Sequence, residues 1–275
     1  MAPDGRFTMP SIPPGGYTLA AIATMPSGET FMATQRIEVN GVDVSGIQLT
    51  PRPPLAIAGR FLDASGAPMP GVTLPVTNLS AGVAAGVGGP GVRPTISPSD
   101  AQGAFSLKDI LPGRYVFGGA MTFGPSIATT TWALQSVMAD GKDITDLPIE
   151  ITPETAPKEV VATLTDQWQG VTGRLSDGAG AAATDYVVVL FPADKTYWLH
   201  GSRRIVAARP DSSGRFTLGG SGIFSVPPGD YLLAAVTDLG KDEQYDPALL
   251  NQLLQAAAPL TLKPGEKKTQ DLVIR

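Results

Sequence analysis

Short runs of alternating apolar and polar residues follow one another along the chain, and turn-forming residues separate them. Alternate side chains of a β-strand point to opposite faces, so each run predicts a strand with one buried face. Residues 186–191 differ, because they form a continuous apolar run, which is typical of a central strand buried on both faces. The 32 glycines and 26 prolines lie mainly between such runs, as turns require. The pattern predicts an all-β chain of many short strands.

A unit of two strand-forming runs recurs three times. An Asp/Gly turn precedes a Phe and a Pro-Gly turn precedes a Tyr, which predicts a β-hairpin with an aromatic residue at the start of each strand. Ten residues separate the Phe from the Tyr in the first two copies and 15 in the third, where a Gly-rich insertion surrounds residues 219–222. The aromatic pairs are Phe7 and Tyr17, Phe105 and Tyr115, and Phe216 and Tyr231.

Two further elements flank this unit. Residues 57–66 and 171–180 each predict a strand followed by an Asp-x-x-Gly turn. Residues 39–47 match residues 138–147 as a closing element. The last copy ends differently, with a strand, a Lys-Pro-Gly-Glu turn and a final strand in residues 260–274.

The repeats predict three modules. Residues 1–52 would form the C-terminal half of a β-sandwich, residues 53–155 a complete sandwich, and residues 156–275 a second complete sandwich with a short helix. Asp246 as N-cap and Pro247 as first helical residue indicate that helix near the C-terminus.

The order Gly-Arg-x-x-Asp-x-x-Gly, Asp-x-x-Gly-x-Phe and Leu/Val-Pro-(Pro)-Gly-x-Tyr resembles the carboxypeptidase regulatory-like domain family. The resemblance covers most of residues 55–275 and the second half of one module in residues 1–50. It implies tandem transthyretin-like (prealbumin-like), Ig-like β-sandwiches, and a place among the secreted and surface proteins of bacteria. These motifs form turns, so they specify a fold but hardly a function.

The first module departs from the family pattern, because residues 1–50 contain no Gly-Arg strand. Half a sandwich exposes an apolar face and open strand edges. Truncation of a longer protein is one explanation. Completion in trans, by a strand or face of another subunit, is the other.

Composition excludes several functions. The chain has no cysteine, so it forms no disulfide and has no thiol nucleophile. Its net charge is −5 and it has no basic block, which argues against nucleic-acid binding. No apolar run is long enough for membrane insertion. Residues 1–6 do not form a signal peptide. We therefore expect an extracellular or periplasmic protein whose signal, if it is exported, lies upstream.

Candidate catalytic chemistry is sparse. His200 is the only histidine, and we expect it in an exposed loop rather than in a catalytic triad. Most acidic residues have turn roles. Asp140, Asp143 and Asp146 are spaced three apart but do not match a calcium loop, so we expect them in turns and on the solvated surface. The sequence predicts no catalytic residue, no metal site and no cofactor.

One segment could bind a ligand. Tyr197 and Trp198, followed by Arg203 and Arg204, lie after the predicted central strand, and exposed aromatics can stack on sugars or anchor a protein contact. The alternative is that Trp198 packs over the end of the sandwich while the arginines pair with acidic turns.

The function predicted from the sequence is therefore that of a non-enzymatic extracellular structural or interaction protein, which self-associates or binds another protein through its incomplete first module. The alternative is a carbohydrate- or peptide-binding accessory module that uses the Tyr197/Trp198 segment.

Overall fold

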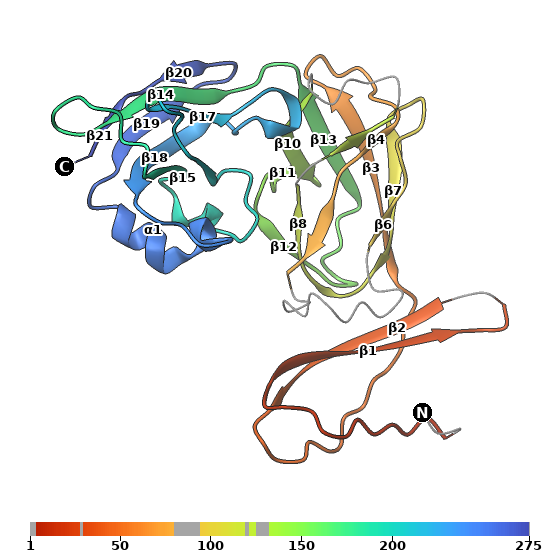
Figure 1. The fold of residues 1–275 in the computed structure, drawn as a ribbon. Helices are drawn as coiled ribbons and strands as arrows, with labels where there is room; N and C mark the ends of the chain where they lie inside the picture. The colour runs from red at the N-terminus through yellow and green to blue at the C-terminus, as the bar shows by residue number, and fades with distance from the viewer. Residues whose placement is uncertain (1–3, 28–29, 80–93, 119–120, 125–131, 275) are drawn as a thin grey trace.

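A computed structural model describes residues 4–27, 30–79, 94–118, 121–124 and 132–274. Figure 1 shows three parts in chain order: an N-terminal β-hairpin, a β-sandwich, and a second sandwich that carries the one α-helix of the described residues. The predicted fold class, all-β with tandem sandwiches and one short helix near the C-terminus, is confirmed.

The middle sandwich packs a six-stranded sheet, in the order β11-β10-β13-β3-β7-β6, against a three-stranded sheet, in the order β12-β8-β5. Strands β4 and β9 pair separately. Large apolar side chains from both sheets, including Phe61, Leu107, Phe117 and Ile151, fill one core. The strands are β3 (Leu55–Asp63), β4 (Val72–Thr73), β5 (Val76–Asn78), β6 (Thr95–Ile96), β7 (Ala104–Ile110), β8 (Gly113–Phe117), β9 (Thr122–Phe123), β10 (Ala133–Ala139), β11 (Lys142–Asp143), β12 (Pro148–Ile151) and β13 (Glu159–Thr165).

The C-terminal sandwich packs the sheet β17-β14-β20, to which β21 also pairs through β14, against the sheet β16-β15-β18-β19. Its elements are β14 (Gly170–Ser176), β15 (Val187–Pro192), η1 (Lys195–Tyr197), β16 (Val206–Ala208), β17 (Arg215–Gly219), η2 (Gly222–Phe224), β18 (Gly229–Val236), η3 (Glu243–Tyr245), α1 (Pro247–Leu253), β19 (Ala258–Leu262), β20 (Lys267–Thr269) and β21 (Leu272–Val273).

Strand β15 is buried along its whole length, as its continuous apolar run predicted. One face contributes to the core between the two sheets. The other face forms a second core with Leu250 and Leu253 of α1 and with Trp198. Helix α1 begins as expected, because the Asp246 side chain accepts a hydrogen bond from the backbone N–H of Ala248 and Pro247 is the first helical residue.

The predicted Phe–Tyr hairpin is wrong for the two complete modules. In each module, the Phe strand (β7 or β17) lies in one sheet and the Tyr strand (β8 or β18) lies in the opposite sheet. The Pro-Gly segment is therefore a corner that carries the chain from one sheet to the other. Each Tyr hydroxyl donates to the carbonyl four residues earlier, at 2.8 Å from Tyr115 to Leu111 and 2.7 Å from Tyr231 to Pro227. The hydrogen bond ties the start of the strand to the corner.

The Asp-x-x-Gly turns have the geometry that their sequence predicts. One carboxylate oxygen of Asp211 accepts from the backbone N–H groups of Ser213 and Arg215, at 2.8 and 3.0 Å, and Gly214 lies at φ +80°. Asp63, Asp100 and Asp177 hold their turns in the same way. The aspartate accepts the hydrogen bonds of the turn, and the glycine takes the left-handed conformation that favours this residue. Both ends of the motif therefore have a physical role.

Strand β13 determines where the middle module ends. It pairs antiparallel with β10 and parallel with β3, so the middle sandwich continues to Thr165. We therefore propose modules of residues 1–52, 53–165 and 166–275, which moves the second expected boundary from residue 155 to the end of β13.

The N-terminal part is a single hairpin of β1 (Gly15–Thr24) and β2 (Thr30–Val39). No strand is assigned to residues 6–14 or 40–51, so the expected closing strand after residue 39 is not formed. A backbone bridge between Met32 and Arg52, with both hydrogen bonds at 2.8 Å, connects the hairpin to the segment before β3.

Candidate interaction sites

The predicted binding segment begins with a short turn that covers the outer face of β15. Asp194 caps η1 by accepting from the backbone N–H of Thr196 at 2.9 Å. The Trp198 ring is buried, its Nε1 donates to the Pro192 carbonyl at 2.8 Å, and it packs edge-on against Phe191. Trp198 therefore packs over the sandwich, which is the second of the two arrangements considered from the sequence.

Arg203 and Arg204 both bind Asp146, which lies in the middle module. Arg203 Nε donates to Asp146 Oδ1 at 2.6 Å and Arg204 Nε to Asp146 Oδ2 at 2.8 Å. The side chains of Arg203, Arg204 and Asp146 are 14%, 11% and 6% exposed, so this cluster is largely buried. The expectation that Asp146 is solvated is wrong, because the turn that carries it faces the neighbouring sandwich.

The arginines also satisfy neighbouring groups. Arg203 Nη1 donates to the Leu134 carbonyl at 2.9 Å. Arg204 Nη1 donates to the Pro228 carbonyl at 3.2 Å and to the Tyr231 hydroxyl at 3.4 Å. Its guanidinium lies 4.4 Å from the centre of the Tyr197 ring. Arg204 therefore connects the Asp146 turn of one module to the tyrosine corner of the next.

Burial and charge shift two groups here in predictable directions. Burial raises the pKa of Tyr231 to about 12, although the nearby Arg204 opposes the shift. Burial by itself would lower the pKa of Arg204, but Tyr231 and Asp146 outweigh it and raise that pKa. At neutral pH the Tyr231 hydroxyl therefore keeps its proton and the Arg204 guanidinium keeps its charge.

A second contact reinforces this junction. The Gly-rich insertion around residues 219–222 leads into η2, and Ile223 of η2 packs against the core of the middle module. Together, Ile223 and the Asp146–Arg203–Arg204 cluster hold the two sandwiches against each other. The contact that Asp146 makes at this junction was not predicted from the sequence. The repeat offers one signal, because Gly46 occupies the matching position. In the structure both residues have positive φ, +74° and +59°.

The four predicted binding residues thus have structural partners. Tyr197 is half-buried beneath Arg204, and the guanidinium groups are engaged at the junction. Their role in binding a ligand stays a prediction.

The inner face of the N-terminal hairpin is a second candidate site. Tyr17 pairs with Ile37 across β1 and β2 in the register that joins Tyr231 to Leu260 across β18 and β19. Tyr231 and Leu260 are buried at 1% and 6% exposure, whereas Tyr17 and Ile37 are only half-buried. Leu19 and Val39 on the same face are half-buried too. Within the described residues, the first module therefore has the strand pairing of a sandwich without a second sheet over its inner face.

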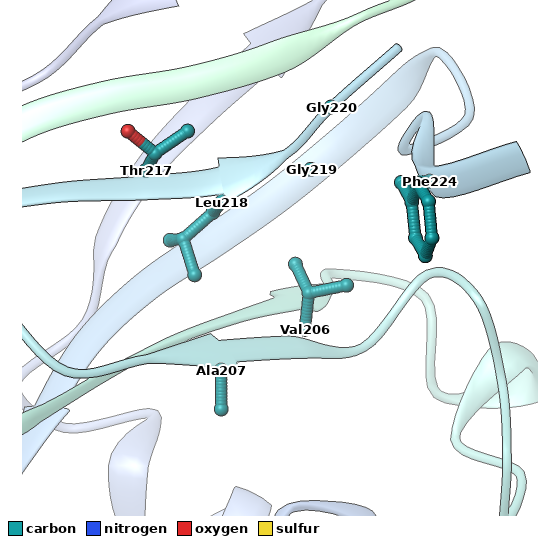
Figure 2. Close-up of a pocket in the computed structure, with 7 residues that line it drawn as sticks. All are labelled: Val206, Ala207, Thr217, Leu218, Gly219, Gly220 and Phe224. Atoms are coloured by element: carbon teal, nitrogen blue, oxygen red, sulfur yellow. The ribbon is translucent and has the colours of Figure 1, made fainter. Parts of the chain in front are cut away.

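A shallow hollow of about 400 Å³ lies at the open edge of the C-terminal sandwich, between β16 and β17. Figure 2 shows Val206 and Leu218 pointing toward each other from these strands, with the Phe224 ring beside them. The lining has no charged side chain, and Thr217 contributes its one polar side chain.

His200 is exposed, as expected, and its ring lies 5.2 Å from that of Tyr245. Within the described residues, no three acidic or histidine side chains are grouped as a metal ion would require. In the same residues, no helix has the length and apolar character to cross a membrane.

No protein-family model and no curated protein matches the chain, so membership of the carboxypeptidase regulatory-like family is not confirmed. The similar solved structures include a streptococcal ancillary pilin, 13% identical over 96% of this chain and 76% of the pilin, with a TM-score of 0.31. The TIE protein of Bacillus anthracis is 11% identical over 94% of this chain and 43% of that protein, with a TM-score of 0.27. BcpA, the major pilin subunit of Bacillus cereus, is 11% identical over 80% and 98%, with a TM-score of 0.27. At TM-scores this low, the fold assignment rests on the strand pairing of the chain itself.

Proposed function

We propose that this chain is a non-enzymatic structural protein of the bacterial surface or periplasm, which assembles with other protein chains through its incomplete first module. The half-exposed inner face of the β1–β2 hairpin carries this proposal, because the matching face of β18–β19 is buried. The location follows from the resemblance of the repeat to secreted and surface proteins.

The rest of the chain supports a structural role. The Asp146–Arg203–Arg204 cluster and Ile223 hold the middle and C-terminal sandwiches in a defined arrangement. Breaking a buried ion pair of this kind is costly, because it leaves a charge without a partner. A fixed pair of sandwiches that presents an open half-module is suited to spacing and joining subunits.

The first test is whether a second copy covers the hairpin. We expect the apparent mass in light scattering after size-exclusion chromatography to rise with protein concentration. Ile37→Glu places a charge on the inner face and should weaken association about tenfold or more. Ala20→Glu is the matched control, because Ala20 lies in the same hairpin on the opposite, exposed face.

Two outcomes would contradict self-assembly. One is a wild-type protein that stays monomeric at the highest concentration tested. The other is an equal effect of both glutamate variants, which would mean that the charge acts without regard to the face. Circular dichroism would show that each variant keeps its strands.

The alternative, carbohydrate or peptide binding by the Tyr197/Trp198 segment, has weaker support. Trp198 is buried, so Tyr197 is the aromatic side chain of this pair with exposed surface. Binding to glycans or peptides that is unchanged in Tyr197→Ala would remove this alternative.

A further inference from the structure

The strand that precedes the Phe strand pairs with a different sheet in each of the two complete modules. β6 begins five residues before Asp100, and β16 begins five residues before Asp211, so the two strands occupy the same place in the repeat. β6 pairs with β7, the Phe strand of the middle module. β16 pairs instead with β15, which lies in the sheet opposite the Phe strand β17. The same short strand therefore covers a different sheet edge in each module.

This difference leaves the outer edge of β17 open. Within the described residues, β17 pairs only with β14, whereas β7 pairs with both β3 and β6. The backbone of Arg215 faces away from β14, because its N–H and its carbonyl form hydrogen bonds with Asp211 at 3.0 and 2.8 Å. Backbone groups alternate in direction along an antiparallel strand, so those of Thr217 face the same way. Among the described residues, none forms a hydrogen bond with these outward groups of Thr217.

The middle module shows how such an edge is covered. Ile96 of β6 lies opposite Leu107 and packs against the core of its sandwich. The next residue, Ser97, donates its backbone N–H to the Ser106 carbonyl at 3.1 Å, and its hydroxyl accepts from the Ser106 N–H at 3.1 Å. An aliphatic residue followed by a serine therefore satisfies both the apolar and the polar groups of this edge.

The open edge of β17 has the same two requirements. Thr217 holds the place of Ser106, directly after the Phe of its strand, and Leu218 follows as Leu107 does in β7. Beside them lies the uncharged hollow of about 400 Å³ between β16 and β17 (Figure 2). Phe224, whose ring lies next to this hollow, is 67% exposed. Apolar surface that is gathered in one place, unlike single exposed residues, indicates an interaction site.

We infer that the edge of β17 binds an extended segment of another protein, in which an aliphatic residue is followed by serine or threonine. The segment would run antiparallel to β17, as β6 runs to β7. Its aliphatic side chain would enter the hollow opposite Leu218, and the following residue would pair with the backbone of Thr217. The β6 of a second copy is not free for this contact, because it pairs with its own β7. The site lies on the C-terminal sandwich, so it is separate from the first module on which the proposed function rests.

A synthetic peptide with the sequence of residues 94–99, Pro-Thr-Ile-Ser-Pro-Ser, is the probe, and two-dimensional NMR of the isotope-labelled full chain is the measurement. We expect saturable shifts of the amide signals of residues 216–219 at peptide concentrations of about 1 mM, because a segment this short buries little surface. Ile96→Asp in the peptide should weaken binding about tenfold or more, because the charge would enter an apolar hollow.

Variants of the full chain test whether the peptide pairs as a strand. Thr217→Pro removes the outward N–H without removing a hydrogen bond to β14, and it should weaken binding about tenfold or more. Thr217→Val is the matched control, because it also loses the hydroxyl but keeps the N–H, and its affinity should stay within about twofold of wild type. Phe224→Ser changes an exposed residue and provides a second test if Thr217→Pro does not fold. It should weaken binding about fivefold through the lost apolar contact.

Four results would overturn the inference. The first is the absence of shifts at residues 216–219 with about 10 mM peptide. The second is equal binding of the Ile96→Asp peptide, or equal affinity of the Thr217→Pro and Thr217→Val proteins. The third is a set of shifts confined to β7, which would mean that the peptide has replaced β6. The fourth is a shift of residues 216–219 with protein concentration in the absence of peptide, which would mean that a second copy, and not another protein, occupies the edge.

Discussion

The first and third modules contain the same local structure in two different environments. In both, a Pro-Pro-Gly-x-Tyr corner starts a strand, the Tyr hydroxyl donates to the carbonyl four residues earlier, and the next strand pairs in the same register. Tyr231 is 1% exposed, whereas Tyr17 is half-buried. The corner is therefore formed by local sequence, and its burial depends on the opposing sheet.

The turns that contain Gly46 and Asp146 differ in a similar way. Gly46 and Asp146 both occupy the left-handed region, which glycine and aspartate tolerate best. Asp146 adds a carboxylate that two arginines of the next module bind. One position thus distinguishes a turn that joins modules from a turn that does not.

The largest effect should come from exchanging these two residues. Asp146→Gly keeps the backbone conformation but leaves Arg203 and Arg204 without their carboxylate, so the free energy of unfolding should fall by about 3–5 kcal/mol. Gly46→Asp should change it by about 1 kcal/mol or less, because a Cβ at Gly46 meets nothing within 4 Å. Urea denaturation measures both. Equal losses of unfolding free energy in the two variants would show that the turn conformation, and not the ion pair, stabilises the protein at this position.

The second effect tests the glycine at the centre of β3, which lies opposite Phe105 in β7. Gly59→Val should destabilise the middle module by about 3 kcal/mol, because the Phe105 ring and the Val160 carbonyl occupy the space of the new side chain. Ala58→Val, at the next and exposed position, should stay within about 0.5 kcal/mol of wild type. Calorimetry of both variants decides. A tolerated Gly59→Val would show that the Phe105 ring can move aside.

The third effect compares the tyrosine corners directly. Tyr231→Phe leaves the Pro227 carbonyl without its buried donor, and we expect a loss of about 1–3 kcal/mol. Tyr17→Phe removes the equivalent hydrogen bond at an exposed site, where water replaces the donor, and should cost about 0.5 kcal/mol or less. Denaturant titrations monitored by circular dichroism measure both losses. A large loss in Tyr17→Phe would mean that the first module is already covered in solution.

Local features of the fold could be predicted from the sequence. The Asp-x-x-Gly turns, the buried strand β15 and the start of α1 each depend on a few adjacent residues, and the structure confirms them. The Phe–Tyr unit was wrongly predicted as a hairpin, because a corner between sheets and a turn within one sheet use the same Pro and Gly residues. Only the pairing of β7 with β3 and of β8 with β12 distinguishes the two.

The candidate sites depended on contacts between distant residues. Asp146 and its two arginines lie in different modules, so no local pattern brings them together. Trp198 is buried because the second face of β15 requires a cover, which becomes apparent only when α1 and the η1 turn are placed on it. The open hairpin was the exception, since the absence of a Gly-Arg strand is visible in the repeat itself.

Ionisation of the buried Tyr231 has the smallest expected effect. It should leave the free energy of unfolding unchanged at neutral pH and lower it only in alkaline solution. A tyrosine in an unfolded chain ionises near pH 10, whereas burial raises the pKa of Tyr231 to about 12. Between these values the unfolded state binds fewer protons, so the free energy of unfolding should be unchanged below about pH 10 and should fall as pH rises toward 12. Tyrosinate absorbance should show a step near pH 12 that Tyr231→Phe removes, and a step of unchanged size in Tyr231→Phe would contradict this assignment.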